Sequence, residues 1–91
     1  MTTVEIDLDK LEPVSVICTE VDLCVTVSNG QTIVTPLWWY PRLQAASPVE
    51  RAKVELTAYG VHWPDIDEDL SVEGMIKGWR SKDAMPPDVA A

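Results

Sequence analysis

The sequence has few of the residues on which nucleic-acid-binding and membrane proteins depend. Lysine and arginine number 7 against 15 aspartates and glutamates, and the net charge of −8 excludes a generic phosphate-binding surface. No apolar run approaches the roughly 20 residues that a membrane-spanning helix needs. The N-terminus has neither the basic start nor the apolar core of a signal peptide. We therefore predict no membrane association and no direct contact with nucleic acid.

Cysteine and histidine are also scarce. Cys18 and Cys24 are too few for a disulfide-based secreted scaffold. Without a signal peptide they are expected to stay reduced, and the protein is expected to be cytoplasmic. His62 is the single histidine, so a zinc site would need both thiols and a carboxylate. No glycine-rich phosphate loop, nucleophile elbow or metalloprotease helix is present. We predict no catalytic residues and no cofactor.

The acidic stretch over residues 65–69 is the segment most similar to a metal site. Its three aspartates have the spacing of the first three ligands of an EF-hand loop. The sixth position of that loop requires glycine and is Leu70, and the twelfth requires glutamate and is Ile76. A solvated acidic loop before a helix N-terminus explains the same charges. No metal is therefore predicted.

A three-stranded antiparallel meander is predicted between residues 13 and 37. Residues 14–18, 23–28 and 31–37 are rich in β-branched residues, and a two-residue Asn29-Gly30 turn of type I′ joins the last two strands. Pairing across the two turns places Val25 opposite both Val16 and Val34. The predicted core face carries Val14, Val16, Cys18, Leu23, Val25, Val27 and Val34.

The opposite face of this sheet is predicted to be half polar. Ile17, Cys24 and Ile33 would lie together near its middle, which makes it a candidate surface for self-association. The same pairing places Cys18 and Cys24 on opposite faces, so the two thiols are not expected to bond to each other.

Two short helices are expected to cover the core face. In the first, Ser47, Pro48 and Glu50 match a capping box, and the helix should run from Pro48 to at least residue 55. Ser71 would cap the second helix. One side of that helix carries Val72, Met75, Ile76 and Trp79.

These elements make one α+β domain over residues 13–79. Residues 1–12 alternate apolar and acidic side chains, which is typical of an edge strand, and a frayed terminus explains the pattern equally well. Residues 61–64 suggest a brief extended segment closed by a proline. Residues 80–91 are small, polar and proline-bearing, and a disordered tail is expected there.

Two signatures give the chain a family resemblance. They are PLWWYPRL at residues 36–43, followed by ASPVER at 46–51, and VHWPDIDEDLSV at 61–72. Over about residues 13–79 the sequence resembles the bacterial family called domain of unknown function 2442. The resemblance implies a small α+β domain without established catalysis, often encoded in gene pairs that resemble toxin–antitoxin pairs. Some relatives add a helix-turn-helix domain, for which this chain is expected to be too short after Trp79.

The leading functional hypothesis is a non-enzymatic protein-binding module, antitoxin-like, that masks a basic partner encoded in the same operon. The acidic stretch would steer the encounter, and nearby aromatic side chains would form the buried anchor. The candidate partner-binding residues are Asp65, Asp67, Glu68, Asp69, Trp38, Tyr40, Arg42, His62 and Trp63.

Two alternatives remain open. The first is a small-ligand-binding protein or enzyme whose site would be built from Trp38, Tyr40, Arg42, His62 and Asp65. The second is a self-associating structural protein, such as a homodimer, that would use the outer sheet face at Ile17, Cys24 and Ile33.

Overall fold

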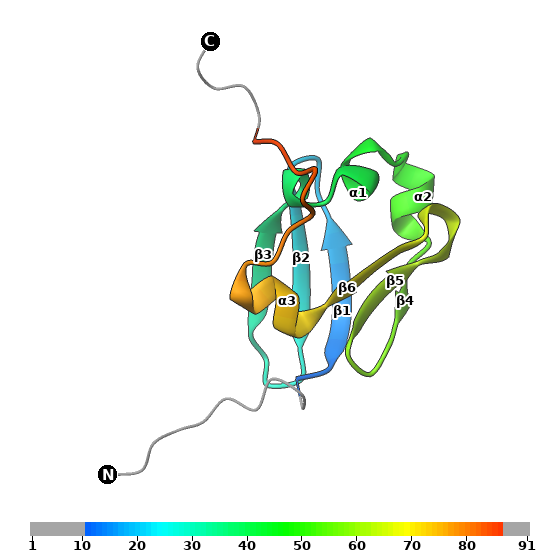
Figure 1. The fold of residues 1–91 in the computed structure, drawn as a ribbon. Coiled ribbons are helices and arrows are strands. Elements are labelled where there is room, and N and C mark those ends of the chain that lie inside the picture. Colours follow the sequence, from blue (N-terminus) through cyan, green and yellow to red (C-terminus); the bar gives the residue numbers. More distant parts are fainter. Residues whose placement is uncertain (1–10, 87–91) are drawn as a thin grey trace.

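The computed structural model describes residues 11–86 and contains two antiparallel sheets of three strands each (Figure 1). The first sheet has the order β1-β2-β3, with strands at Pro13–Cys18, Asp22–Val27 and Thr32–Pro36. The second has the order β4-β5-β6, with strands at Glu55–Leu56, Gly60–Trp63 and Glu68–Ser71. The fold is α+β, as predicted. The edge strand expected within residues 1–12 lies almost wholly outside the described residues.

Short helices connect and follow the sheets. The 3₁₀ turn η2 (Leu37–Trp39) leads into α1 (Pro41–Ala45) and α2 (Pro48–Ala52), and α3 (Val72–Lys77) follows β6 directly. A second 3₁₀ turn, η3 (Pro64–Ile66), joins β5 to β6. Among the described residues, no helix is both long enough and apolar enough to span a membrane.

One hydrophobic core lies between the two sheets and α3. In Figure 1, α3 and β6 cross in front of the first sheet. The first sheet contributes alternate residues of its central strand β2, because successive side chains of a strand point to opposite faces. The buried apolar residues are Leu23, Val25 and Val27 of β2, Leu37, Tyr40 and Leu43 of the η2–α1 region, Val61 and Trp63 of β5, and Val72 and Met75 of α3.

The pairing of β2 with β3 differs by one residue from the predicted pairing. Val25 lies opposite Ile33 rather than Val34. The Val27 N–H donates to the Gln31 carbonyl at 2.9 Å, so the loop has three residues, and Gly30 alone among them has a positive φ, at 90°. An Asn-Gly type I′ turn would need positive φ at both residues, whereas a three-residue loop needs it only at the last.

This one-residue shift exchanges the faces of β3, because a strand's side chains alternate. Ile33 packs against the core, and Val34 is 57% exposed. The predicted placement of Ile33 on the outer face was therefore wrong, and the outer row across the three strands is Ile17, Cys24 and Val34.

The pairing of β1 with β2 agrees with the prediction along most of its length. Val16 lies opposite Val25, and a register irregularity between residues 13 and 15 leaves Val14 exposed rather than in the core. Cys18 packs against the core, while Cys24 lies between the inward-facing Leu23 and Val25. Both cysteines are free thiols, and they lie on opposite faces as predicted.

The predicted first helix is correct at its start and too long at its end. Ser47 and Glu50 form the capping box at α2, which ends at Ala52. Val49, Leu56 and Tyr59, which recur at helical spacing in the sequence, are all exposed, so no buried apolar face extends the helix. The chain instead turns and forms β4.

The second sheet was not predicted beyond an extended segment at 61–64. The Thr57 hydroxyl accepts the Gly60 N–H at 3.0 Å, and this tight turn pairs β4 with β5. Residues 68–71, interpreted from the sequence as the end of a loop, pair with β5 as strand β6.

The end of α3 is set by Gly78. Gly78 has a left-handed conformation (φ 79°), and the Trp79 N–H donates to the Gly74 carbonyl at 2.8 Å, which is the pattern of a Schellman cap. Ser71 caps the other end of the helix through the Gly74 N–H, as predicted. Val72 and Met75 are buried, whereas Ile76 and Trp79 are exposed.

Candidate functional site

The acidic residues lie where β5 turns into β6, at one end of the second sheet. We call Asp65, Asp67, Glu68 and Asp69 the acidic end. Asp65 lies in η3, Asp67 has a left-handed conformation (φ 52°), and β6 begins at Glu68. The four carboxylates therefore occupy a tight turn and an edge strand, rather than a loop that leads straight into a helix.

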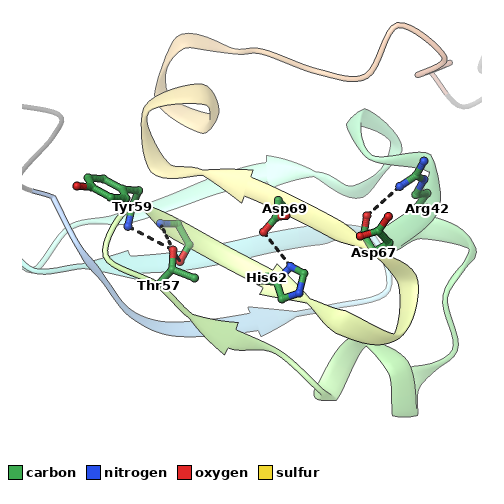
Figure 2. Close-up of polar contacts among 7 residues, drawn as sticks. Arg42, Thr57, Tyr59, His62, Asp67 and Asp69 are labelled. Atoms are coloured by element: carbon green, nitrogen blue, oxygen red, sulfur yellow. Dashed lines mark hydrogen bonds and ion pairs between the residues drawn. The ribbon is translucent and has the colours of Figure 1, made fainter.

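His62 and Asp69 are direct cross-strand partners on β5 and β6. The His62 Nδ1 atom lies 2.8 Å from Asp69 Oδ1, and Figure 2 shows this contact on the side of the second sheet away from β1–β3. The Asp69 side chain is 76% exposed, against 27% for His62. The pair is ionic only when the imidazole is protonated.

Two basic side chains besides His62 contact the acidic end. Lys53 Nζ lies 3.3 Å from Asp65 Oδ2. Arg42 Nη1 donates to the main-chain carbonyl of Asp67 at 2.8 Å (Figure 2). This contact attaches α1 to the β5–β6 turn through the main chain and not through the Asp67 carboxylate.

Glu68 is the half-buried member of the acidic end. Burial raises the pKa of its carboxyl, because desolvation disfavours the charged form. The hydrogen bond from the Asp69 main-chain N–H and the charge of Arg42 oppose that rise, and the negative charges of Asp69 and Asp67 add to it. Glu68 is thus an acid that faces inward, beside the buried Tyr40.

Two of the predicted partner-binding aromatic residues belong to the core. Tyr40 is 3% exposed and donates from its hydroxyl to Thr35 Oγ1 at 3.0 Å, and burial raises the pKa of that hydroxyl. Trp63 is fully buried, and its indole N–H donates to the Arg51 carbonyl at 3.1 Å. In this structure neither side chain is accessible to a partner.

The adjacent Trp38 and Trp39 are both half-buried, and Trp39 packs against the core. The guanidinium of Arg80 lies 5.3 Å from the ring centroid of Trp38 and 5.0 Å from that of Trp39. The Ser81 N–H donates to the Trp39 carbonyl at 3.1 Å. These contacts hold residues 80 and 81, which the sequence suggested as the start of a tail, against η2.

A cleft of about 250 Å³ lies beside β6, and no sequence pattern predicted it. We call it the β6 cleft. All four residues of β6 line it, together with Tyr40, Gly74 and Met75, and Trp79, Arg80 and Ser81 line the other side. Gly78 is the sequence signal that could have predicted the position of Trp79. A glycine that caps a helix reverses the chain direction, so the residue after it no longer lies on the helix.

Three of the residues proposed for a small-ligand or enzymatic site have polar partners outside that set. Asp65 pairs with Lys53, His62 pairs with Asp69, and Arg42 contacts the Asp67 main chain. Of the five residues Trp38, Tyr40, Arg42, His62 and Asp65, only Tyr40 lines the β6 cleft. Within residues 11–86, no group of three or more histidines, cysteines or acids is arranged to hold a metal ion.

Residues 13–81 match the family described as "Protein of unknown function (DUF2442)". The chain belongs to this family. The DUF2442 match extends from β1 to Ser81, and so includes the acidic end and every residue that lines the β6 cleft. The predicted family is therefore confirmed.

A solved structure shares the DUF2442 fold seen here. It is the crystal structure of a protein of unknown function from Rhodospirillum rubrum ATCC 11170 at 2.75 Å resolution. The two sequences are 27% identical, the TM-score is 0.68, and the match covers 81% of this chain and 94% of that one. The comparison with curated proteins finds no match.

Proposed function

We propose that this DUF2442 protein is a non-enzymatic protein-binding module, antitoxin-like, whose acidic end masks a basic partner protein. The observation that carries the proposal is the concentration of four carboxylates within five residues of a turn and edge strand. Asp65, Asp67 and Asp69 are exposed there. The tight turn and the β5–β6 pairing hold them in place.

The local charge balance at the acidic end supports a basic partner. In the described part of the chain, Lys53 is the lysine paired with one of these carboxylates, and the His62–Asp69 pair is ionic only when histidine is protonated. Arg42 donates to the Asp67 main-chain carbonyl, and its positive charge also acts on Glu68, so two cations lie among four carboxylates. A surplus of negative charge therefore remains at this end. Such a surplus accelerates encounter with a positive surface and repels acidic competitors.

The test compares two variants that remove the same charge from different places. Asp67→Asn with Asp69→Asn changes the acidic end, and Glu12→Gln with Glu20→Gln changes exposed acids around β1 of the other sheet. Each immobilised protein is exposed to a lysate of the organism that encodes the chain. We expect the wild type and the Glu12/Glu20 variant to retain a basic protein, and the Asp67/Asp69 variant to lose it.

The proposal also predicts that the captured protein dissociates as the salt concentration rises, because salt screens exposed charges. Two results would overturn it. One is equal retention of the partner by the Asp67/Asp69 variant, and the other is a wild type that retains no basic protein.

A further inference from the structure

The β6 cleft runs along a strand edge that no other strand of residues 11–86 occupies. In the order β4-β5-β6, β6 pairs with β5 on one side, and the cleft lies against all four of its residues. An unpaired strand edge presents N–H and C=O groups that an added strand can use.

The direction of these main-chain groups follows from the β5–β6 pairing. The Val72 N–H donates to the Tyr59 carbonyl at 2.9 Å, so that pair is hydrogen-bonded. Antiparallel pairs alternate between hydrogen-bonded and non-hydrogen-bonded. The pairs Gly60–Ser71 and His62–Asp69 are therefore non-hydrogen-bonded. The main-chain groups of Asp69 and the N–H of Ser71 consequently point away from β5, toward the free edge, whereas the Ser71 carbonyl is used by the first turn of α3.

Glu68 supplies a charged group at this edge. Its side chain is on the inner face with that of its cross-strand partner Trp63, and it lines the cleft. The Glu68 carboxylate accepts the Asp69 main-chain N–H. A strand added to β6 would take over that N–H and leave the carboxylate to bind a cation.

The other wall of the cleft is partly apolar. Trp79 packs over Gly74, where an added Cβ would lie 3.0 Å from its ring, and the side chain remains 57% exposed. The volume of about 250 Å³ is below the roughly 300–1,000 Å³ typical of cofactor and drug-sized sites. The cleft is thus sized for one or two side chains of an extended segment. Arg80, the positive residue of the lining, is stacked on Trp38 and Trp39.

We propose that the β6 cleft binds an extended peptide segment that carries lysine or arginine, which adds to β6 as an antiparallel strand. The peptide main chain pairs with the N–H and C=O of Asp69 and with the N–H of Ser71. A basic side chain of the peptide reaches Glu68, and its aliphatic part lies against Trp79. In strand addition, main-chain hydrogen bonds provide the affinity, and contacts of alternate side chains provide the specificity. This inference rests on the proposed function, because it names the part of a basic partner that the module recognises.

The probe is an acetylated, amidated hexapeptide in which valine and lysine alternate. Its lysines all lie on one face when the peptide is extended. With lysine opposite Glu68, the valine N–H groups point to β6 and the lysine N–H groups point away. Two further peptides carry N-methyl groups either on the valines or on the lysines. Binding is measured by titration while the amide resonances of the protein are followed.

We expect the amide resonances of Asp69 and Ser71 to move on binding of the parent peptide. Methylation of the valines should abolish binding, and methylation of the lysines should leave it. Glu68→Gln should weaken binding about tenfold, as expected for the loss of a charge-assisted hydrogen bond. Glu12→Gln is the matched control on an exposed glutamate outside the cleft.

Trp79→Ala should weaken binding of the peptide, because the aliphatic part of its lysine side chain lies against this ring. Tyr59→Ala, at another exposed aromatic residue, should leave binding unchanged.

The inference is wrong if both methylated peptides bind as the parent does, or if the Asp69 and Ser71 resonances do not move. If the Asp67/Asp69 variant nevertheless loses the basic partner protein, the proposed function stands and only strand addition fails. If the peptide binds as expected but that variant retains the partner, masking by the acidic end fails and the peptide site stands.

Discussion

Gly60 lies where the main chains of β5 and β6 approach each other closely. A Cβ at this position would lie 1.9 Å from the Leu70 carbonyl oxygen and 2.8 Å from the carbonyl carbon, so β5 and β6 could not keep their pairing. We expect Gly60→Ala to destabilise the protein by about 1–3 kcal/mol, as overpacking typically does. Chemical denaturation measures the loss. An unchanged free energy of unfolding would contradict the close approach.

Glu68 makes the stability of the protein depend on pH. Burial raises the pKa of Glu68 in the folded protein above its value in the unfolded chain. Between these two pKa values the folded state binds more protons than the unfolded state, so the protein becomes less stable as pH rises through that range. Glu68→Gln keeps an acceptor and carries no charge. We expect this variant to be more stable than wild type at neutral pH, and the difference to vanish below pH about 4, under the ordinary glutamate pKa.

Denaturation of the wild type and the Glu68→Gln variant at neutral and acidic pH tests this expectation. A variant that is less stable than wild type at neutral pH would show that the attraction of the charged carboxylate to the Asp69 N–H and to Arg42 outweighs the cost of burying the charge.

At the scale of elements, α2 depends on its ends, because it has five residues and none of them is buried. Ser47 Oγ accepts the Glu50 N–H at 3.1 Å, and Glu50 Oε1 accepts the Ser47 N–H at 2.8 Å. Arg51 binds the carbonyls of Leu43 and Gln44 at 3.0 and 2.6 Å, and so attaches α2 to α1.

Ser47→Ala should therefore reduce the free energy of unfolding by about 1 kcal/mol, the usual contribution of a cap. Ser15→Ala, at an exposed serine on β1, is the matched control and should have almost no effect. Equal stability of the two variants in chemical denaturation would show that the capping box does not stabilise the domain.

Elements with strong local signals could be predicted from the sequence. The strands β1–β3 have β-branched runs, and Ser47 and Ser71 have the side chains that cap helices. The β2–β3 register could not be predicted, since Asn29-Gly30 is compatible with loops of two or three residues. The second sheet was missed because β4 has two residues and β6 is an edge strand with exposed acids, a pattern typical of loops.

In the candidate site, too, the features with a local sequence pattern were predicted and those that depend on long-range packing were not. The acidic end was predicted as a cluster because its residues are adjacent in the sequence. The β6 cleft was not, because it brings together residues from β6, α3 and the segment after Gly78 that have no common sequence pattern. The burial of Tyr40 and Trp63 depends on the whole core, which a local pattern does not reveal.

For the whole molecule, the outer face of the first sheet suggests self-association. Ile17, Cys24 and Val34 form a row across β1, β2 and β3, and Ile17 and Val34 are 63% and 57% exposed. Both sheets and α3 share the core on the other side. We expect a homodimer at high concentration, since a small domain gains stability by burying such a face against a second copy.

Sedimentation of the wild type and an Ile17→Glu, Val34→Glu variant tests the homodimer. The variant should be monomeric, and a Val21→Glu, Val49→Glu control, at equally exposed valines away from this row, should associate as wild type does. A monomeric wild type would rule out the homodimer. So would equal association of the wild type and the Ile17/Val34 variant.

The acidic end is proposed to bind a basic protein, and this binding can be measured directly. The most direct test is calorimetric titration of the captured partner into three proteins: the wild type, the Asp67→Asn, Asp69→Asn variant and the Glu12→Gln, Glu20→Gln variant. In about 50 mM salt, where exposed charges are weakly screened, the Asp67/Asp69 variant should bind at least about tenfold more weakly than the other two. Equal affinity of the partner for all three proteins would contradict the claim.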